Sequence, residues 1–232
     1  MRAKRAGSHH GKPETSILDA QAWVASPEPR RSIAPARGNG YIAGMSQAAT
    51  PPTLIIPPGN DAPVLPILIV PQPVLKARAK PVTPAHAAEV AALIPRMFST
   101  MYRAPGIGLA APQVGVGLRL AVIDVMPGDK PTPIVLINPE IISESAELAT
   151  REEGCLSIPN LYADVTRPAR VRVRYTDQHG AAHEIEADGL LAACLQHEID
   201  HLDGVLFVDH ISALKRNMIL RKLAKDQKGK KG

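Results

Sequence analysis

The chain has 232 residues, of which 45% are hydrophobic and 21% are charged. This composition allows one hydrophobic core of ordinary size and disfavours both a coiled coil and a wholly disordered chain. The formal net charge is +5, and it is unevenly distributed: residues 1–62 carry +3, residues 63–214 carry −5 and residues 215–232 carry +7. An acidic body is therefore flanked by two basic ends.

The cysteine content and the hydrophobic runs restrict the cellular environment. Two cysteines, Cys155 and Cys194, are too few for a disulfide framework, which favours a reducing compartment. No run approaches the ~18 apolar residues of a membrane span, so we expect no membrane partner. No apolar segment typical of a secretory signal follows the basic start. We predict a cytoplasmic protein, with an organelle matrix as the alternative if residues 1–44 act as a transit peptide.

Three segments differ in composition. Residues 1–62 are rich in Gly, Pro, Ser and Ala and have few periodic apolar positions, so we predict a disordered or weakly ordered extension. Met45 lies within it and offers an alternative start. Residues 63–214 are expected to form the folded domain, and residues 215–232 a basic helix and tail.

Periodicity within the folded domain predicts these elements in chain order. Residues 63–74 contain several prolines and fit an edge or extended segment. Thr83 and Pro84 are typical of a helix start, and an apolar stripe predicts a helix over 85–103, which Pro95 should kink or divide. Runs rich in Val and Ile predict strands over 118–125, 134–138, 141–148, 170–175 and 183–187, the last two forming a hairpin.

Two further helices are expected near the carboxyl end. Helical period returns over 190–203, where Gly204 is placed to end the helix, and Ser212 can cap a last helix over 213–225. Strands between helices without strict alternation predict an α+β fold with mixed or antiparallel sheets.

The helix over 190–203 carries the strongest chemical signal, His-Glu-x-x-His at 197–201. Residues four apart on a helix share a face, so His197 and His201 can bind one metal ion. Glu198 can then reach a water on that ion without binding it. We expect this helix to lie centrally, with the sheets packed around it.

A catalytic metal site usually has three protein ligands and one open position, so the third ligand identifies the class. The metzincin pattern requires a histidine where the chain has Phe207, and the thermolysin type requires a later glutamate, yet none follows Glu198. Asp209 or His210 would be the remaining third ligand of a peptidase. That class is disfavoured.

Two cysteines compete for the third position. Cys155 lies in a loop bounded by Gly154 and Pro159, where backbone can approach a site, and it is the favoured ligand. Cys194 shares a helical face with the two histidines and stays open from spacing alone. Against Cys194, three ligands from consecutive turns of one helix have little freedom to form a tetrahedron.

A third stretch, Gly106–Gly115, combines glycines with alanines and suggests a backbone that approaches a ligand closely. It lacks the order of a phosphate-binding loop. Gln113 is its only polar side chain, and a primary amide can donate to a developing oxyanion.

Together these stretches resemble the peptide deformylase family. The family motifs G-x-G-x-A-A-x-Q, E-G-C-L-S and Q-H-E-x-D-H are complete and in order as Gly106–Gln113, Glu153–Ser157 and Gln196–His201. The resemblance covers about residues 65–214, and it implies that residues 63–214 are a catalytic domain that hydrolyses the formyl group of N-formylmethionine on new polypeptides.

The resemblance also implies roles for individual residues. Cys155, His197 and His201 would bind a divalent ion, Fe²⁺ first, with Zn²⁺ as the alternative and Ni²⁺ or Co²⁺ possible substitutes. Glu198 would be the general base and acid. The Gln113 side chain and the Leu156 N–H would donate to the oxyanion, while Ile107, Gly108 and Gly154 would bind the substrate.

The expected partners are the nascent N-formylmethionyl polypeptide and, through the basic carboxyl-terminal helix, the ribosome. A different class is an RNA-binding module with a structural metal. It is disfavoured because no fourth ligand stands in a motif and the tail has no aromatic residue. We expect no sequence-specific nucleic-acid partner.

Overall fold

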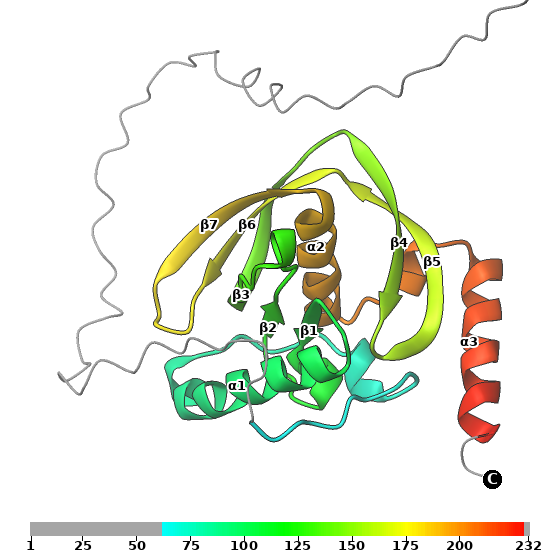
Figure 1. Cartoon of the computed structure of the whole chain (residues 1–232), viewed down its shortest axis with the longest axis horizontal. Helices are drawn as coiled ribbons and strands as arrows, with labels where there is room; N and C mark the ends of the chain where they lie inside the picture. Colours follow the sequence, from blue (N-terminus) through cyan, green and yellow to red (C-terminus); the bar gives the residue numbers. More distant parts are fainter. Residues whose placement is uncertain (1–61, 230–232) are drawn as a thin grey trace, which may run out of the picture. The chain divides into compact units, whose positions relative to one another are not determined.

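The computed structural model describes residues 62–229, which lie within one compact unit, Thr50–Gly232. The expected extension, residues 1–62, lies outside the described part except for Ala62. Helices combine with two antiparallel sheets, so the α+β prediction is confirmed (Figure 1).

The larger sheet has five strands in the order β1-β2-β3-β6-β7, all paired antiparallel. The strands are β1 (Gly108–Ala110), β2 (Leu120–Ile123), β3 (Ile134–Glu144), β6 (Arg170–Thr176) and β7 (Ala182–Asp188). The sequence predicted β2, β6 and β7 closely, including the β6–β7 hairpin. It missed β1, which has only three residues within the glycine-rich stretch.

Strand β3 corrects the prediction of two strands over 134–138 and 141–148. The chain continues as one strand because a register shift between Ile137 and Glu140 absorbs the break at Asn138. Asn138 adopts a positive φ of 51°, which asparagine tolerates better than most residues. Its side chain accepts from the Val82 N–H at 2.8 Å and donates to the Val82 carbonyl at 2.9 Å.

The second sheet pairs β4 (Leu148–Cys155) with β5 (Ile158–Pro168), and neither strand was predicted as such. Glu153 is the one buried residue of β4, so hydrophobic periodicity gives little signal there. Buried and more exposed residues alternate along much of β5, but one of the buried positions is the charged residue Arg167. Figure 1 shows β4 and β5 on the opposite side of helix α2 (Gly189–Asp203) from β6 and β7.

Helix α1 (Ala87–Arg103) follows a short 3-10 turn, Pro84–His86. The predicted apolar stripe is buried against the sheet: Val90, Leu93, Ile94, Met97, Phe98 and Met101. Pro95 does not divide the helix. The buried stripe continues on both sides of Pro95, and such packing supplies most of a helix's stability in a protein.

Helix α2 (Gly189–Asp203) carries the His-Glu-x-x-His motif and packs on the sheet through Ala192, Leu195, Ile199 and Leu202. It ends at Gly204, as predicted, with a φ of 74°. A Cβ at Gly204 would also lie 2.7 Å from the Lys76 carbonyl oxygen. Backbone conformation and space therefore both require glycine here.

Residues 63–74 form no regular strand, but their backbone joins two parts of the domain. The Leu68 N–H donates to the Gln113 carbonyl at 2.8 Å, and the Val70 N–H donates to the Ser157 carbonyl at 3.1 Å. A 3-10 turn, Pro73–Lys76, follows. The predicted extended segment therefore holds two of the motif stretches in place.

Helix α3 (Ala213–Gly229) follows the 3-10 turn Phe207–His210 and lies beyond β5 (Figure 1). The predicted cap is confirmed, since the Lys215 N–H donates to Ser212 Oγ at 3.3 Å. Leu223 is buried in a cluster with β5, and Gln227 Nε2 donates to the Val70 carbonyl at 3.0 Å. Among residues 62–229, no helix has the length and hydrophobicity needed to cross a bilayer.

Candidate active site

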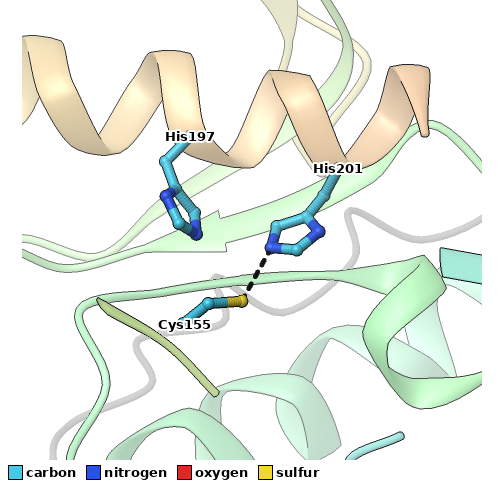
Figure 2. Close-up of side chains that lie close together, drawn as sticks. All are labelled: Cys155, His197 and His201. Atoms are coloured by element: carbon cyan, nitrogen blue, oxygen red, sulfur yellow. Dashed lines mark hydrogen bonds between the residues drawn. The ribbon is translucent and has the colours of Figure 1, made fainter. Parts of the chain in front are cut away.

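Two neighbouring turns of α2 and the end of β4 bring three potential metal ligands together (Figure 2). One ligand atom from each of Cys155, His197 and His201 lies within 4.8 Å of the other two. Cys155 Sγ lies 3.2 Å from His201 Nε2. One thiolate with two imidazoles suits a transition metal such as iron or zinc, so the residues present fit the ion that the motifs imply.

The surroundings of Cys155 favour the thiolate form that binds metal. Burial alone would raise the pKa of the thiol, but the charge of His201 and hydrogen bonds from both imidazoles lower this pKa well below its usual value. Cys155 therefore has the character of a ligand and differs from an ordinary buried cysteine.

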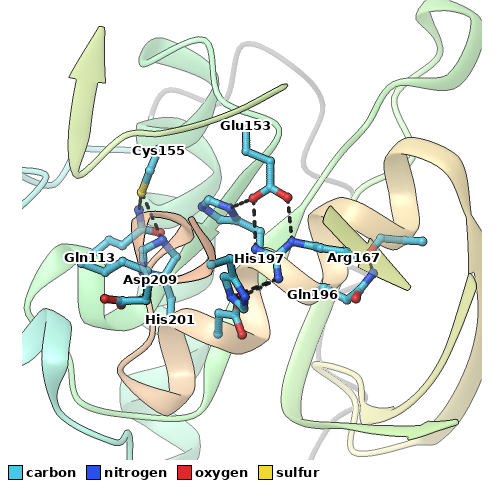
Figure 3. Close-up of polar contacts among 12 residues, drawn as sticks. Gln113, Glu153, Cys155, Arg167, Gln196, His197, His201 and Asp209 are labelled. Carbon is cyan, nitrogen blue, oxygen red and sulfur yellow. Dashed lines mark hydrogen bonds and ion pairs between the residues drawn. The ribbon is translucent and has the colours of Figure 1, made fainter. Parts of the chain in front are cut away.

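His197 is held from behind by a buried ion pair (Figure 3). Its Nδ1 lies 2.9 Å from Glu153 Oε2, and Glu153 in turn accepts two hydrogen bonds from Arg167. Burial opposes ionisation of Glu153, but the hydrogen bonds and charges of His197 and Arg167 lower its pKa to about 2. Glu153 is thus ionised at neutral pH and can only accept, so His197 Nδ1 carries a hydrogen toward it. A metal ion would bind at Nε2 in place of a proton.

Glu198 lies beside the three ligands and is 3% exposed. Its Oε2 has no hydrogen-bond partner among residues 62–229. Burial raises the pKa of Glu198 to about 7, although the charges of His197 and His201 oppose this shift. A carboxyl with a pKa near neutrality and a free oxygen suits proton transfer.

Gln113 lies beside Cys155 and is also buried. Its Oε1 accepts from the Ala110 N–H at 2.8 Å, which fixes the amide orientation. Its Nε2 then donates to Cys155 Sγ at 3.5 Å and to Ser157 Oγ at 3.3 Å. The donor side of the amide therefore points to the metal-ligand group.

A cavity of about 900 Å³ opens onto these groups. The predicted substrate residues Ile107, Gly108 and Gly154 line it, as does Leu156, whose backbone was the other predicted oxyanion donor. The structure thus brings every residue predicted for catalysis or substrate binding to one cavity, whose wall also includes Cys155 and His197.

The alternative ligands are placed elsewhere. Cys194 is buried in the cavity wall, where its Sγ donates to the Ile107 carbonyl at 3.6 Å, and burial raises its pKa well above the usual value. Asp209 binds Lys76, and His210 binds Asp200. Among the described residues, the ligand group with the two histidines contains Cys155 and none of these three.

Sequence reasoning missed several residues of this region. Ile67 and Ile69 of the extended segment line the cavity, and so does Tyr162 of β5. A Cβ at Gly154 would lie 2.5 Å from the Tyr162 ring, so the aromatic side chain covers the glycine of the second motif. Arg167 was missed as well. Its only sequence signal is a charge at an inward strand position, and that signal requires β5 to be recognised first.

Known proteins resemble this chain along the whole described domain. The polypeptide deformylase family profile matches residues 64–217. A peptide deformylase of Agrobacterium fabrum is 54% identical over 168 residues, covering 72% of this chain and 98% of the relative. A peptide deformylase of Mesorhizobium japonicum is 53% identical over 169 residues, covering 72% of this chain and 96% of the relative.

Solved structures of peptide deformylases also resemble this chain. A crystal structure of a peptide deformylase from Legionella pneumophila has a TM-score of 0.68 at 50% identity, covering 72% of this chain and 97% of that chain. One from Synechococcus elongatus, in complex with actinonin, has a TM-score of 0.64 at 47% identity, with coverages of 68% and 86%. The fold and the site define a metal-dependent hydrolase. The chain belongs to the polypeptide deformylase family, whose members remove the formyl group from the amino terminus of new polypeptides.

Proposed function

We propose that this chain hydrolyses the formyl group of nascent N-formylmethionyl polypeptides with one divalent ion held by Cys155, His197 and His201. The observation that carries the proposal is the convergence of these three ligand atoms, within 4.8 Å of one another, beside a cavity lined by Cys155, His197, Glu198 and Gln113. A bound ion would supply Lewis acidity that polarises a carbonyl oxygen and makes water a stronger acid.

Glu198 is the proposed general base and acid. Its unpartnered Oε2 can accept a proton from the attacking water and then deliver it to the amine that leaves. Its pKa of about 7 allows both transfers near neutral pH. The close contact between Gly108 and Glu198 supports this role. It keeps the Glu198 carboxyl against the edge strand β1, where an extended peptide would bind.

Gln113 and the Leu156 N–H are the proposed oxyanion donors. The orientation of the Gln113 amide is fixed by its acceptor bond from the Ala110 N–H, so Nε2 faces Cys155 and Ser157 and could turn one of these long hydrogen bonds to an oxyanion. Preorganised donors of this kind stabilise developing charge at no cost of reorganisation. Ile107, Gly108 and Gly154 are the proposed backbone contacts for the substrate.

We propose Fe²⁺ as the ion in the cell, on the family resemblance, with Zn²⁺ as the alternative because the same donor set accepts it. The test is the metal content of protein purified without oxygen, together with formate release from formyl-Met-Ala-Ser. We expect one ion per chain and turnover that a chelator abolishes. A chain that releases no formate after loading with Fe²⁺, Zn²⁺, Ni²⁺ or Co²⁺ would contradict the proposal.

We further propose that α3 binds the ribosome through RNA phosphates. Its exposed basic residues support this proposal: Lys215, Arg221, Lys222, Lys225 and Lys228. The helix is anchored by buried Leu223, so its charged side can stay exposed while the other side packs on the domain. Cytoplasmic localisation stays a prediction, because residues 1–44 lie outside the described part.

A further inference from the structure

Behind the metal-ligand group lies a buried guanidinium that does not reach the cavity. The Arg167 side chain is 7% exposed. Its Nε donates to Glu153 Oε1 at 2.6 Å, and its Nη2 donates to Glu153 Oε2 at 3.0 Å. Two parallel bonds between a guanidinium and a carboxylate fix the relative orientation of both groups. Glu153 can therefore rotate little while Arg167 is in place.

Glu153 in turn restricts the orientation of the His197 ring. The same oxygen, Oε2, accepts from His197 Nδ1 at 2.9 Å. Hydrogen bonding at Nδ1 fixes the imidazole tautomer and the direction of Nε2. His201 differs, because its buried Nδ1 has no hydrogen-bond partner in the described part of the chain. Of the two imidazoles, His197 is the one with a carboxylate and a guanidinium behind it (Figure 3).

The third guanidinium nitrogen of Arg167 connects the Glu153–His197 pair to α2. Nη1 donates to Asp200 Oδ2 at 2.8 Å, and His210 Nε2 lies 2.7 Å from that same oxygen. Arg167 on β5 thus links Glu153 on β4 with the helix that carries His197. One cation faces two carboxylates, so its removal would leave the buried Glu153 and the half-buried Asp200 without the charge that they share.

We propose that Arg167 is a positioning residue of the metal centre, which holds Glu153 against His197 Nδ1 and thereby aims His197 Nε2 at the ion. This inference rests on the proposed function, because it requires that His197 is a ligand. Arg167 itself does not line the cavity, so it would contact neither a substrate nor an ion bound there. It should therefore govern metal affinity and the rate of the chemical step, and leave substrate binding unchanged.

The test compares R167K and R167M with the full-length wild type. The dissociation constant for Co²⁺ is measured by competition with a chelator, and the absorption spectrum of the Co²⁺ protein and the separate kcat and KM for formyl-Met-Ala-Ser are recorded. Loss of such a supporting group typically weakens metal binding about 10–100-fold. We expect this loss in R167M, a lower kcat, an unchanged KM and an altered Co²⁺ spectrum.

R167K keeps the positive charge but cannot form the two parallel bonds, so we expect partial rescue. If R167M does not fold, R167K alone decides, with Co²⁺ binding expected to be weaker than in the wild type but by less than the about 10–100-fold loss of a complete deletion. R119M is the matched control, because Arg119 is 14% exposed and donates to Asp203 Oδ1 at 2.7 Å without reaching a ligand. Its Co²⁺ affinity, spectrum and kcat should equal those of the wild type.

Two results would overturn the inference: R167K with wild-type Co²⁺ affinity and kcat, or R119M with losses equal to those of R167M, which would indicate a general effect of removing a buried arginine. A wild-type chain that binds no Co²⁺ would instead contradict the proposed function itself. The two failures are therefore distinguishable.

Discussion

Glu198 lies so close to Gly108 that a Cβ on the glycine would be 2.3 Å from Glu198 Oε1 and 3.0 Å from Cys194 Sγ. Strand β1 and helix α2 meet at this point without room for a methyl group. Because both atoms in the way are side-chain termini, a larger residue at position 108 would displace Glu198 without separating the two elements.

The first prediction concerns G108A. We expect the variant to fold and retain metal, while kcat/KM for formyl-Met-Ala-Ser falls about a hundredfold because the carboxyl is misplaced. G117A is the matched control, since a Cβ at Gly117 meets no atom within 4 Å. Equal activity of G108A and G117A would show that the position of Glu198 is not critical.

The second prediction concerns the charge of Glu198. E198Q preserves the shape of the side chain but cannot accept a proton, so we expect kcat to fall by about 10²–10⁴ with unchanged metal content. Metal analysis and formate release on the same preparation measure both. E89Q, at an exposed position of α1, should match the wild type. Wild-type turnover by E198Q would refute the assigned role.

The third prediction distinguishes the two cysteines. C155A should lose the metal, because it removes the sulfur of the ligand group, whereas C194A should retain it. Both changes shorten a side chain by one sulfur atom, so each is a control for the other. The measurement is the ratio of metal to protein after gel filtration. The opposite pattern would identify Cys194 as the ligand.

The fourth prediction concerns stability. A ligand that binds only the folded state stabilises it by about 2.7 kcal/mol when its free concentration is a hundred times Kd. Removing the ion with a chelator should therefore lower the Tm of the wild type by several degrees in a thermal scan. C155A should show no such chelator effect. If C155A shifted as much as the wild type, the stabilising ion would lie elsewhere.

The fifth prediction tests the surface of α3. Truncation would remove buried Leu223 as well as charge, so charge reversal of exposed residues is the sharper change. R221E/K222E/K225E should co-sediment less with ribosomes. The slope of the logarithm of the association constant against the logarithm of the salt concentration should become less negative by up to about 2. Turnover of formyl-Met-Ala-Ser should stay at the wild-type level.

The control for this surface reverses three exposed basic residues elsewhere, K80E/R103E/K130E. It produces the same change in net charge away from α3. Equal loss of co-sedimentation in both triple variants would indicate a general charge effect and remove α3 as the docking element.

Short-range periodicity was sufficient for much of the domain. The buried stripe of α1, the β6–β7 hairpin, the end of α2 at Gly204 and the placement of His197 beside His201 all depend on residues a few positions apart. These features follow from local backbone geometry, which the sequence expresses directly.

Long-range packing decided the rest. Cys155 rather than Cys194 meets the histidines because β4 ends beside α2, a contact between residues 46 positions apart. The β4–β5 pair and its inward Arg167 follow from long-range strand pairing, and hydrophobic alternation along β4 is weak. The sequence by itself therefore determined the helix on which His197 and His201 share a face. The sequence favoured Cys155 as their partner, but only the tertiary structure brought it beside them and built the buried ion pair behind His197, because both depend on which distant segments pack together.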